Sequence, residues 1–377
     1  MTQALDGLRI VDFSRVLAGP LATMVLADLG AAVTKIERPD GGDDTRAWGP
    51  PYDDGGRATY FQAANRNKDS VVLDLRTVDG AARARELAAA ADVVVENFRP
   101  GVMDRLGLGH AELRAASPGL VYCSITGFGS GAGAALPGYD LLIQALGGLM
   151  SITGEPDGEP QKVGVALVDV ISGLFASVGI LAALRHRERT GEGQRVEIDL
   201  LSCLLAALAN QGSAYTLAGR VGGRMGNAHP SIAPYEPLPT GDGDLVLAVG
   251  NDRQFGALTR VVGRPELAED ARFAVNEARV ANRGELRRLL VDALAAKPAA
   301  DWVPALSEAG VPAGRVNDIA GAFALAESLG LDPVVEVPRP DGTAARLTRN
   351  PIGLSATPPT YRSAPPALDE RPSEANG

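Results

Sequence analysis

The chain contains 377 residues, of which 45% are hydrophobic and 22% are charged, a balance typical of a folded globular protein and not of a disordered or collagen-like chain. Its 46 acidic residues outnumber its 36 basic residues, so the formal net charge is −10, and we expect neither nucleic acid nor an anionic membrane as a partner. The two cysteines, Cys123 and Cys203, provide neither a disulfide framework nor a metal site, which favours a reducing, cytoplasmic location.

The sequence gives no sign of a targeting or membrane segment. Asp6 precedes the first apolar run, and no basic leader of a secretory signal is present. The most apolar helical stretch, Leu174 to Leu184, is shorter than a bilayer is thick and continues into a segment with three arginines. We therefore expect no membrane span.

Short β-rich runs alternate with helical runs in the first half of the chain. Hydrophobic periodicity predicts strands at 8–13, 32–36, 70–75, 92–95 and 120–125, and helices at 17–29 and 80–91. This alternation is typical of a parallel, doubly wound sheet with helices on both faces. The sequence therefore predicts an α/β fold.

The second half changes character after three further elements, a long helix, a strand and an apolar helix, predicted at 169–189, 195–200 and 201–217. A Gly- and Pro-rich segment with little periodicity follows, and we interpret it as a linker between domains. Beyond it the pattern predicts a strand at 244–249 and helices at 254–262, 283–296 and 301–308.

These changes predict four parts: a large domain, a linker, a small α/β domain and a C-terminal segment, at 1–217, 218–240, 241–317 and 318–377. The last part opens with a helix at 318–329 and strands at 334–337 and 344–347. From Pro365 onward the Pro-rich composition favours an extended or disordered tail.

Well-known catalytic motifs are absent. No phosphate-binding P-loop occurs, and the loop SRVLAGP after the first strand lacks the glycine pattern of a dinucleotide site. The glycines between residues 127 and 133 open no clear helix, so we interpret them as a flexible loop. His110 and His186 lie in contexts typical of surface residues, whereas the Gly- and Pro-rich loop around His229 leaves both a structural and a binding role open.

Asp169 is the carboxylate that stands out, because it lies in the apolar sequence VGVALVDVISGL at the start of a predicted helix. A buried carboxylate is costly unless it is stabilised, and a helix N-terminus offers unpaired N–H groups and the positive end of a dipole. The residues alone leave two roles open. Asp169, or Ser172 after it, caps the helix, or Asp169 performs chemistry.

Several segments in fixed order carry a resemblance to a known family: LDGLRIVDFSRVLAGPLATMVLADLG, NRNKDSVVLDLR, VVVENFRPGVMDRLGLG, PGYDLLIQALGG and GVPAGRVND. Together they are similar to the class III CoA-transferase family of CaiB/BaiF type. The segment GNAHPSIAPYEPLPTGDGDLVL most resembles members that exchange CoA between short dicarboxylic acids, such as succinyl-CoA:glutarate enzymes. The resemblance implies a Rossmann-like large domain to which the C-terminal segment returns, a smaller domain and an interlocked homodimer.

The resemblance also implies a mechanism and a site. Asp169 corresponds to the family's nucleophile, which carries CoA as an aspartyl thioester, with an acyl-CoA as substrate and without a metal or a tightly bound cofactor. The residues implied to bind CoA are Val16, Ala18, Arg38, Leu73, Arg76, Asn97, Phe98, Arg99, Arg105 and Tyr139. A dicarboxylate acceptor needs a partner for its second charge, for which we consider Arg46, His229 and Ser231.

Two other functions are weighed against CoA transfer. An α-methylacyl-CoA racemase of similar fold uses a histidine where this chain has Tyr139, and tyrosine, with a reference pKa near 10, is a poor general base at neutral pH. A noncatalytic CoA-binding subunit would not need Asp169. Formate and oxalate are not favoured acids, because Leu17 replaces a glutamine of formyl-CoA enzymes and VGNDRQF replaces their glycine-rich lid. We expect succinyl-CoA as donor and a C4 to C6 dicarboxylate as acceptor.

Overall fold

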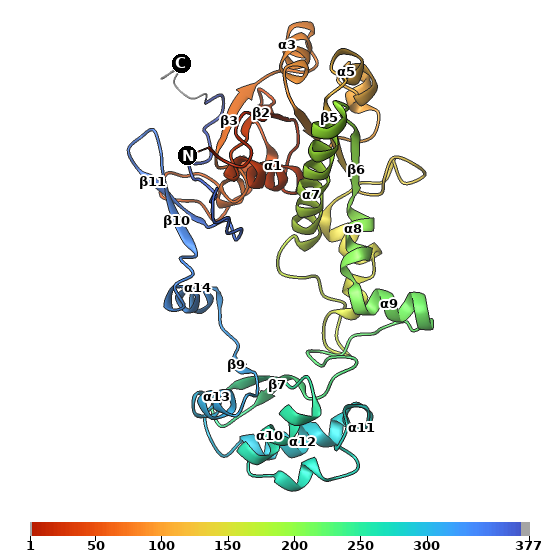
Figure 1. Ribbon diagram of the computed structural model, residues 1–377, viewed down its shortest axis with the longest axis vertical. Coiled ribbons are helices and arrows are strands. Elements are labelled where there is room, and N and C mark those ends of the chain that lie inside the picture. The colour runs from red at the N-terminus through yellow and green to blue at the C-terminus, as the bar shows by residue number, and fades with distance from the viewer. Residues whose placement is uncertain (1, 371–377) are drawn as a thin grey trace. The chain divides into compact units, whose positions relative to one another are not determined.

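The computed structural model describes residues 2–370 (Figure 1). Contacts within the chain divide it into two compact units. The larger unit comprises residues up to 149, then 162–220 and the segment from 332 onward, and the smaller unit comprises 150–161 and 221–331. Each unit is described by itself.

Six parallel strands form the sheet of the larger unit, in the order β3-β2-β1-β4-β5-β6. They are β1 (Arg9–Asp12), β2 (Ala32–Glu37), β3 (Lys68–Val72), β4 (Val93–Glu96), β5 (Val121–Thr126) and β6 (Arg195–Asp199). All six predicted strands are therefore confirmed, with shifts of a few residues at their ends. The order is that of a Rossmann fold. In such folds ligands bind outside the carboxyl ends of the strands, at the point where the strand order reverses, which here lies between β1 and β4.

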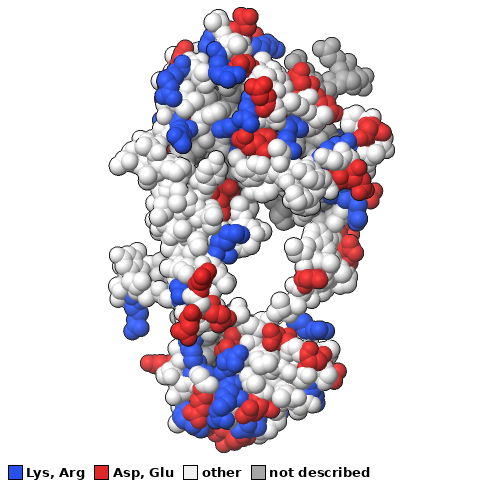
Figure 2. Space-filling view, turned by 180° about the vertical axis from the view of Figure 1, so that it is seen from behind, with Lys and Arg blue, Asp and Glu red and all other residues white. Residues whose placement is uncertain are grey.

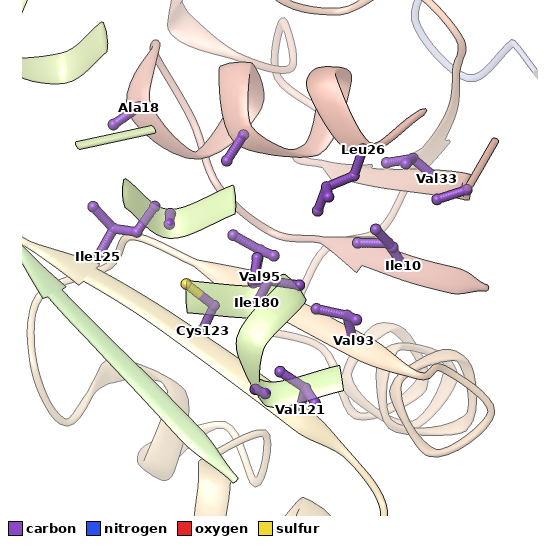
Figure 3. Close-up of a cluster of buried hydrophobic side chains, with 14 of the residues drawn as sticks. Ile10, Ala18, Leu26, Val33, Val93, Val95, Val121, Cys123, Ile125 and Ile180 are labelled. Atoms are coloured by element: carbon purple, nitrogen blue, oxygen red, sulfur yellow. The ribbon is translucent and has the colours of Figure 1, made fainter. Parts of the chain in front are cut away.

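Helices cover both faces of this sheet. On one face α1 (Ala18–Asp28) and α7 (Leu167–Thr190) pack on a core that includes Ile10, Val95 and Ile180 (Figure 3). On the other face α3 (Val78–Ala89) and α5 (His110–Ala116) enclose a second core. The remaining helical segments of this unit are η1 (Asp44–Ala47), α2 (Thr59–Gln62), α4 (Val102–Arg105), α6 (Asp140–Leu146), α8 (Leu200–Ala207) and α9 (Ala209–Ala218). A further turn, η2 (Leu149–Ile152), lies where the first part of the unit ends.

The long helix predicted at 169–189 is confirmed as α7, whereas the helix predicted at 201–217 differs. The apolar stretch around Leu174 lies inside the 24-residue helix α7. The length of α7 and the mean hydropathy of 2.2 over an 18-residue stretch of it would suffice to cross a membrane. In the structure 44% of that 18-residue stretch is buried. The helix predicted at 201–217 is instead divided into α8 and α9, because Ala209 adopts a left-handed conformation with φ 43°.

The smaller unit contains an antiparallel sheet of β7 (Tyr235–Pro239), β8 (Asp244–Ala248) and β9 (Ala313–Arg315). Its helical segments are α10 (Asp252–Val261), η3 (Pro265–Ala268), α11 (Asn276–Ala281), α12 (Arg283–Leu294), α13 (Ala299–Glu308) and α14 (Ile319–Ser328). Strand β7 lies within the segment interpreted as a linker. Its two prolines disguise it in the sequence, and they are tolerated because β7 is an edge strand.

After residue 331 the chain forms a hairpin of β10 (Val334–Pro338) and β11 (Ala344–Thr348) and then runs beside β3. The N–H of Asn67 donates to the carbonyl of Ser363 at 2.9 Å, and that of Ser70 donates to Glu370 at 2.9 Å. Glu370, which lies in the tail predicted as extended or disordered, is therefore hydrogen-bonded to β3. The rest of that tail, 371–377, lies outside the described residues.

Candidate active site

Asp169 is the third residue of α7, and a carboxylate from another helix caps that helix. Asp140, the first residue of α6, accepts the N–H groups of Val168 and Asp169 with Oδ1, at 2.8 and 3.2 Å. Within residues 2–370 the side chain of Asp169 makes no capping hydrogen bond. The capping role left open for Asp169 thus belongs to Asp140, and the Asp169 carboxyl group is available for chemistry.

The surroundings of Asp169 favour its neutral form. Burial raises the pKa of Asp169, and the nearby negative charge of Asp140 raises it further, to about 7. Gln144 fixes Asp140 in this position, because its Nε2 donates to Asp140 Oδ2 at 2.6 Å while its Oε1 accepts the N–H of Val163 at 2.9 Å. A carboxyl group that titrates near neutral pH is typical of a reactive site.

A close approach of two helices brings Asp169 to the first turn of α1. A Cβ atom on Gly173 would lie only 2.6 Å from the carbonyl oxygen of Ala18, so the contact requires glycine. Asp169 lies four residues before Gly173 and therefore on the same face of α7. Ala18 and Asp169 accordingly line one small cavity of about 90 Å³.

This cavity, which we call the aspartate cavity, gathers residues from the carboxyl ends of several strands. Besides Ala18 and Asp169, its walls include Asn97, Phe98 and Arg99 after β4 and Gly127, Gly129, Gly133 and Gly138 after β5. A Cβ on Gly127 would lie 2.4 Å from the Cα of Gly138, so the two glycines permit the loop to close on itself. The glycine run interpreted as a flexible loop is therefore a wall of the site.

A second cavity of about 600 Å³ shares Phe98 with the aspartate cavity, and we call it the arginine cavity. Its lining includes Arg38, Leu73 and Arg76, all of which the resemblance implies in CoA binding. Arg38 pairs with Asp44 at 2.7 Å and Arg76 pairs with Asp74 at 2.8 Å, and both guanidinium groups are exposed. The geometry offers cations for phosphates beside an aromatic ring.

Three residues implied to bind CoA do not line either cavity. Tyr139 is 65% exposed, and Arg105 lies exposed on α4. Val16 precedes the first turn of α1 with an unusual positive φ of 71°. Their part in binding remains a prediction.

The structure does not support Arg46 as a free cation. Its guanidinium donates to both carboxylate oxygens of Glu37, at 2.6 and 2.8 Å, and lies 3.8 Å from the ring centre of Phe61. Its charge is already paired, and it lines neither cavity. Arg46 is paired because Glu37, a buried acid on β2, needs a cation to balance its charge.

His229 and Ser231 belong to the smaller unit, where they form part of an ordered loop. The N–H of Ser231 donates to His229 Nδ1 at 3.1 Å, and Arg283 donates to the carbonyl of His229 at 3.0 Å. The His229 ring lies 5.3 Å from that of Tyr235. Their role toward an acceptor remains a prediction.

Two residues near Asp169 escaped the sequence analysis. Asp140 follows Tyr139 in the GYD triplet, but nothing in the sequence shows that it reaches a helix 28 residues away. Tyr60 lies in a Gly- and Pro-rich region without periodicity. Burial raises the pKa of Tyr60, and the charges of Asp169 and Asp140 raise it further, so its phenol stays protonated and able to donate.

Comparisons with known proteins show the family of the chain. A family model described as CoA-transferase family III matches residues 5–371. A succinate–glutarate CoA-transferase from Agrobacterium fabrum is 45% identical over 97% of this chain and 93% of its own length. An acetyl-CoA:oxalate CoA-transferase from Acetobacter aceti is 41% identical over 97% and 93%. The crystal structure of a CaiB/BaiF family protein from Brucella suis superposes with a TM-score of 0.86 at 45% identity, covering 98% of this chain and 97% of that chain.

Proposed function

Because the chain belongs to CoA-transferase family III, we propose that it moves CoA from an acyl-CoA donor to a carboxylic acid through Asp169. The observation that carries this proposal is the shared cavity of Asp169 with Ala18, Asn97, Phe98 and Arg99, next to a second cavity lined by arginines. These are the residues that a CoA thioester would contact if its sulfur approached Asp169 and its phosphates approached Arg38 and Arg76.

The chemistry begins with the ionised form of Asp169. Its carboxylate attacks the thioester carbonyl of the donor, which forms a mixed anhydride and releases CoA thiolate. The thiolate attacks the activated carbonyl of Asp169, giving an aspartyl-CoA thioester and the free donor acid. The acceptor carboxylate then attacks this thioester, which releases CoA thiolate and forms a second mixed anhydride. The thiolate attacks the acceptor carbonyl of that anhydride, giving the new acyl-CoA and the free carboxylate of Asp169. Each intermediate stays activated only if water is excluded.

We propose succinyl-CoA as the donor and a C4 to C6 dicarboxylate, with glutarate foremost, as the acceptor. The support is the similarity to the succinate–glutarate CoA-transferase, whose name states these two acids. The similarity to an acetyl-CoA:oxalate enzyme is only slightly lower, so acetyl-CoA and oxalate belong in the same assay.

The test is a panel of acids incubated with succinyl-CoA or acetyl-CoA, with the acyl-CoA products separated by mass spectrometry. The proposal predicts glutaryl-CoA from succinyl-CoA and glutarate, and loss of transfer in Asp169→Ala, whose secondary structure should be unchanged. Oxalyl-CoA as the main product would change the proposed donor and acceptor acids but would leave CoA transfer as the reaction. Near wild-type turnover of Asp169→Ala would contradict the mechanism.

The same preparation distinguishes the two other functions. A racemase would exchange the α-proton of a 2-methylacyl-CoA in deuterated water. We do not expect this exchange, because this chain has Tyr139 where the racemase has its histidine. A noncatalytic subunit would bind CoA without forming a new acyl-CoA.

We further propose that the protein acts as an interlocked homodimer. Large apolar side chains are exposed along α7, α8 and α9, including Phe175, Val178, Leu205 and Leu217, which is typical of a surface that a partner covers. Basic and acidic side chains are interspersed on the face seen in Figure 2, which supports the proposal that nucleic acid is not a partner. The cytoplasmic location remains a prediction.

A further inference from the structure

The backbone between β1 and α1 leads from the arginine cavity, lined by Arg15, to the aspartate cavity, lined by Ala18. Side chains hold the loop formed by residues 14–16. The Ser14 carbonyl accepts from Lys35 Nζ at 2.8 Å. The Asn97 amide pairs with both backbone groups of Arg15, at 2.9 and 2.7 Å. The path of the loop between the cavities is therefore set by side chains from β2 and from the end of β4.

Val16 holds the least favourable conformation of this loop. Its φ of 71° lies in the left-handed region, where a β-branched side chain clashes with the backbone. Its N–H group faces the carboxylate of Asp43, at 3.3 and 3.2 Å from the two oxygens. A conformation of this kind persists only where its surroundings hold it, and Asp43 provides that hold.

Asp43 is itself held on several sides. Lys35 Nζ lies 2.9 Å from Oδ2, and both side chains are completely buried. The N–H and hydroxyl groups of Thr45 donate to Oδ1 at 3.0 and 2.8 Å. A buried ion pair adds little net stability once its desolvation is counted, so a role in geometry explains its presence better than a role in stability.

We infer that Asp43 is a positioning residue for acyl-CoA binding, which acts by holding the Val16 amide and thereby the path of the loop between the two cavities. The inference rests on the proposed function, since it concerns the binding of that same substrate. Asp43 belongs to the wall of the arginine cavity, where its side chain is fully buried, and it reaches the loop through the N–H group of Val16.

A double-mutant cycle tests this inference. Asp43→Asn should raise the KM for the acyl-CoA about tenfold, because a neutral amide replaces the charged acceptor of the Val16 N–H group, with a smaller change in kcat. Glycine adopts φ near 70° without strain, so in the Val16→Gly background the same Asp43→Asn change should raise KM less than about threefold. An equal effect of Asp43→Asn in both backgrounds would overturn the inference, as would no change in KM.

Two controls complete the experiment. Thr45→Val removes a hydrogen bond from the same carboxylate but leaves the loop alone, so its effect on KM should be the same in both backgrounds. If Lys35 without its partner prevents folding, the neutral pair Lys35→Met and Asp43→Asn replaces the single variant. The pair also removes the Lys35 hydrogen bond to the Ser14 carbonyl, but that loss is common to both backgrounds, so the difference between the backgrounds still reports on Val16. A wild-type protein that neither binds nor transfers CoA would refute the proposed function instead, which keeps the two failures distinct.

Discussion

Asp169 and Asp140 form a pair of carboxylates that the fold assigns to different tasks. Asp140 accepts two N–H groups at the start of α7, whereas Asp169, within the part of the chain that the structure describes, makes no capping bond and lines a cavity. The apolar context of Asp169 drew attention to it in the sequence, and its role as nucleophile was implied by the family resemblance. The position of Asp140 could not be predicted, because it depends on where α6 lies in space. Arg46 was considered as a cation for the acceptor, and its pairing with the buried Glu37 could not be predicted either, because nothing in the sequence shows that contact.

The first prediction concerns the pH dependence of transfer. Burial, together with the charge of Asp140, raises the pKa of Asp169 to about 7, and only the ionised carboxylate attacks a thioester. The value of kcat/KM for the donor should therefore rise with pH to a plateau above neutrality. Asp140→Asn removes the neighbouring negative charge, so the rising limb should move to lower pH. An unshifted limb in Asp140→Asn would show that this charge does not act on the nucleophile.

The second prediction concerns stability. The pKa of Asp169 is higher in the folded chain than in the unfolded chain, so folding binds a proton between about pH 4 and pH 7, and stability falls as pH rises through this window. The Asp169→Asn side chain stays neutral at every pH in this window, so the variant does not lose stability in this way. Urea unfolding should show that its advantage over the wild type grows by about 2–3 kcal/mol from pH 5 to pH 8. A constant difference across this range would contradict the raised pKa.

At the scale of elements, regular features were predictable and short ones were not. The six strands and the long helices carry period-two or helical patterns, and the structure confirms them. The short helices α2, α4 and α6 are too brief for a periodic signal, yet α2 carries Tyr60 and α6 carries Asp140. The predicted helix at 201–217 failed because one left-handed residue, Ala209, has no signature in the sequence.

The third prediction concerns the contact of α1 with α7. Gly173→Ala would place Cβ 2.6 Å from the Ala18 carbonyl oxygen, a backbone atom that can move only with its helix. We expect a loss of about 1–3 kcal/mol in the free energy of unfolding and a lower kcat/KM, because α7 carries Asp169.

The matched control is Gly179→Ala on the same helix. Its Cβ would meet only Cγ1 of the Val196 side chain, at 2.8 Å, and that side chain can shift. Its effect on kcat/KM should be small. Equal activity losses in the two variants would show that the approach of Ala18 to α7 does not set the site.

At the scale of the whole chain, the sequence indicated an α/β protein but gave no physical reason for the C-terminal segment to return. That return was implied only by the family resemblance. The structure shows that Asn67 links the two ends of the larger unit: its Oδ1 accepts the N–H groups of Arg362 and Ser363, at 2.6 and 3.1 Å, and its Nδ2 donates to the Thr360 carbonyl at 2.7 Å. Such pairing between distant residues has no local signal.

The fourth prediction follows from this link. Asn67→Ala leaves buried polar groups without partners, so the free energy of unfolding should fall by about 2–4 kcal/mol. Limited digestion with trypsin should cut after Arg362 faster than in the wild type. Asn276→Ala in the smaller unit, where Asn276 holds the Ser231 carbonyl, should not alter that cleavage. Unchanged cleavage in Asn67→Ala would mean that the segment is held elsewhere.

The central claim is that CoA passes through a covalent bond to Asp169, and trapping that bond is its most direct test. The protein is incubated with succinyl-CoA, treated with hydroxylamine and digested, and the peptide that contains Asp169 is examined by mass spectrometry. We predict a hydroxamate on Asp169 that depends on succinyl-CoA and is absent from Asp169→Ala. Acyl transfer by the same preparation with Asp169 unmodified would contradict the account.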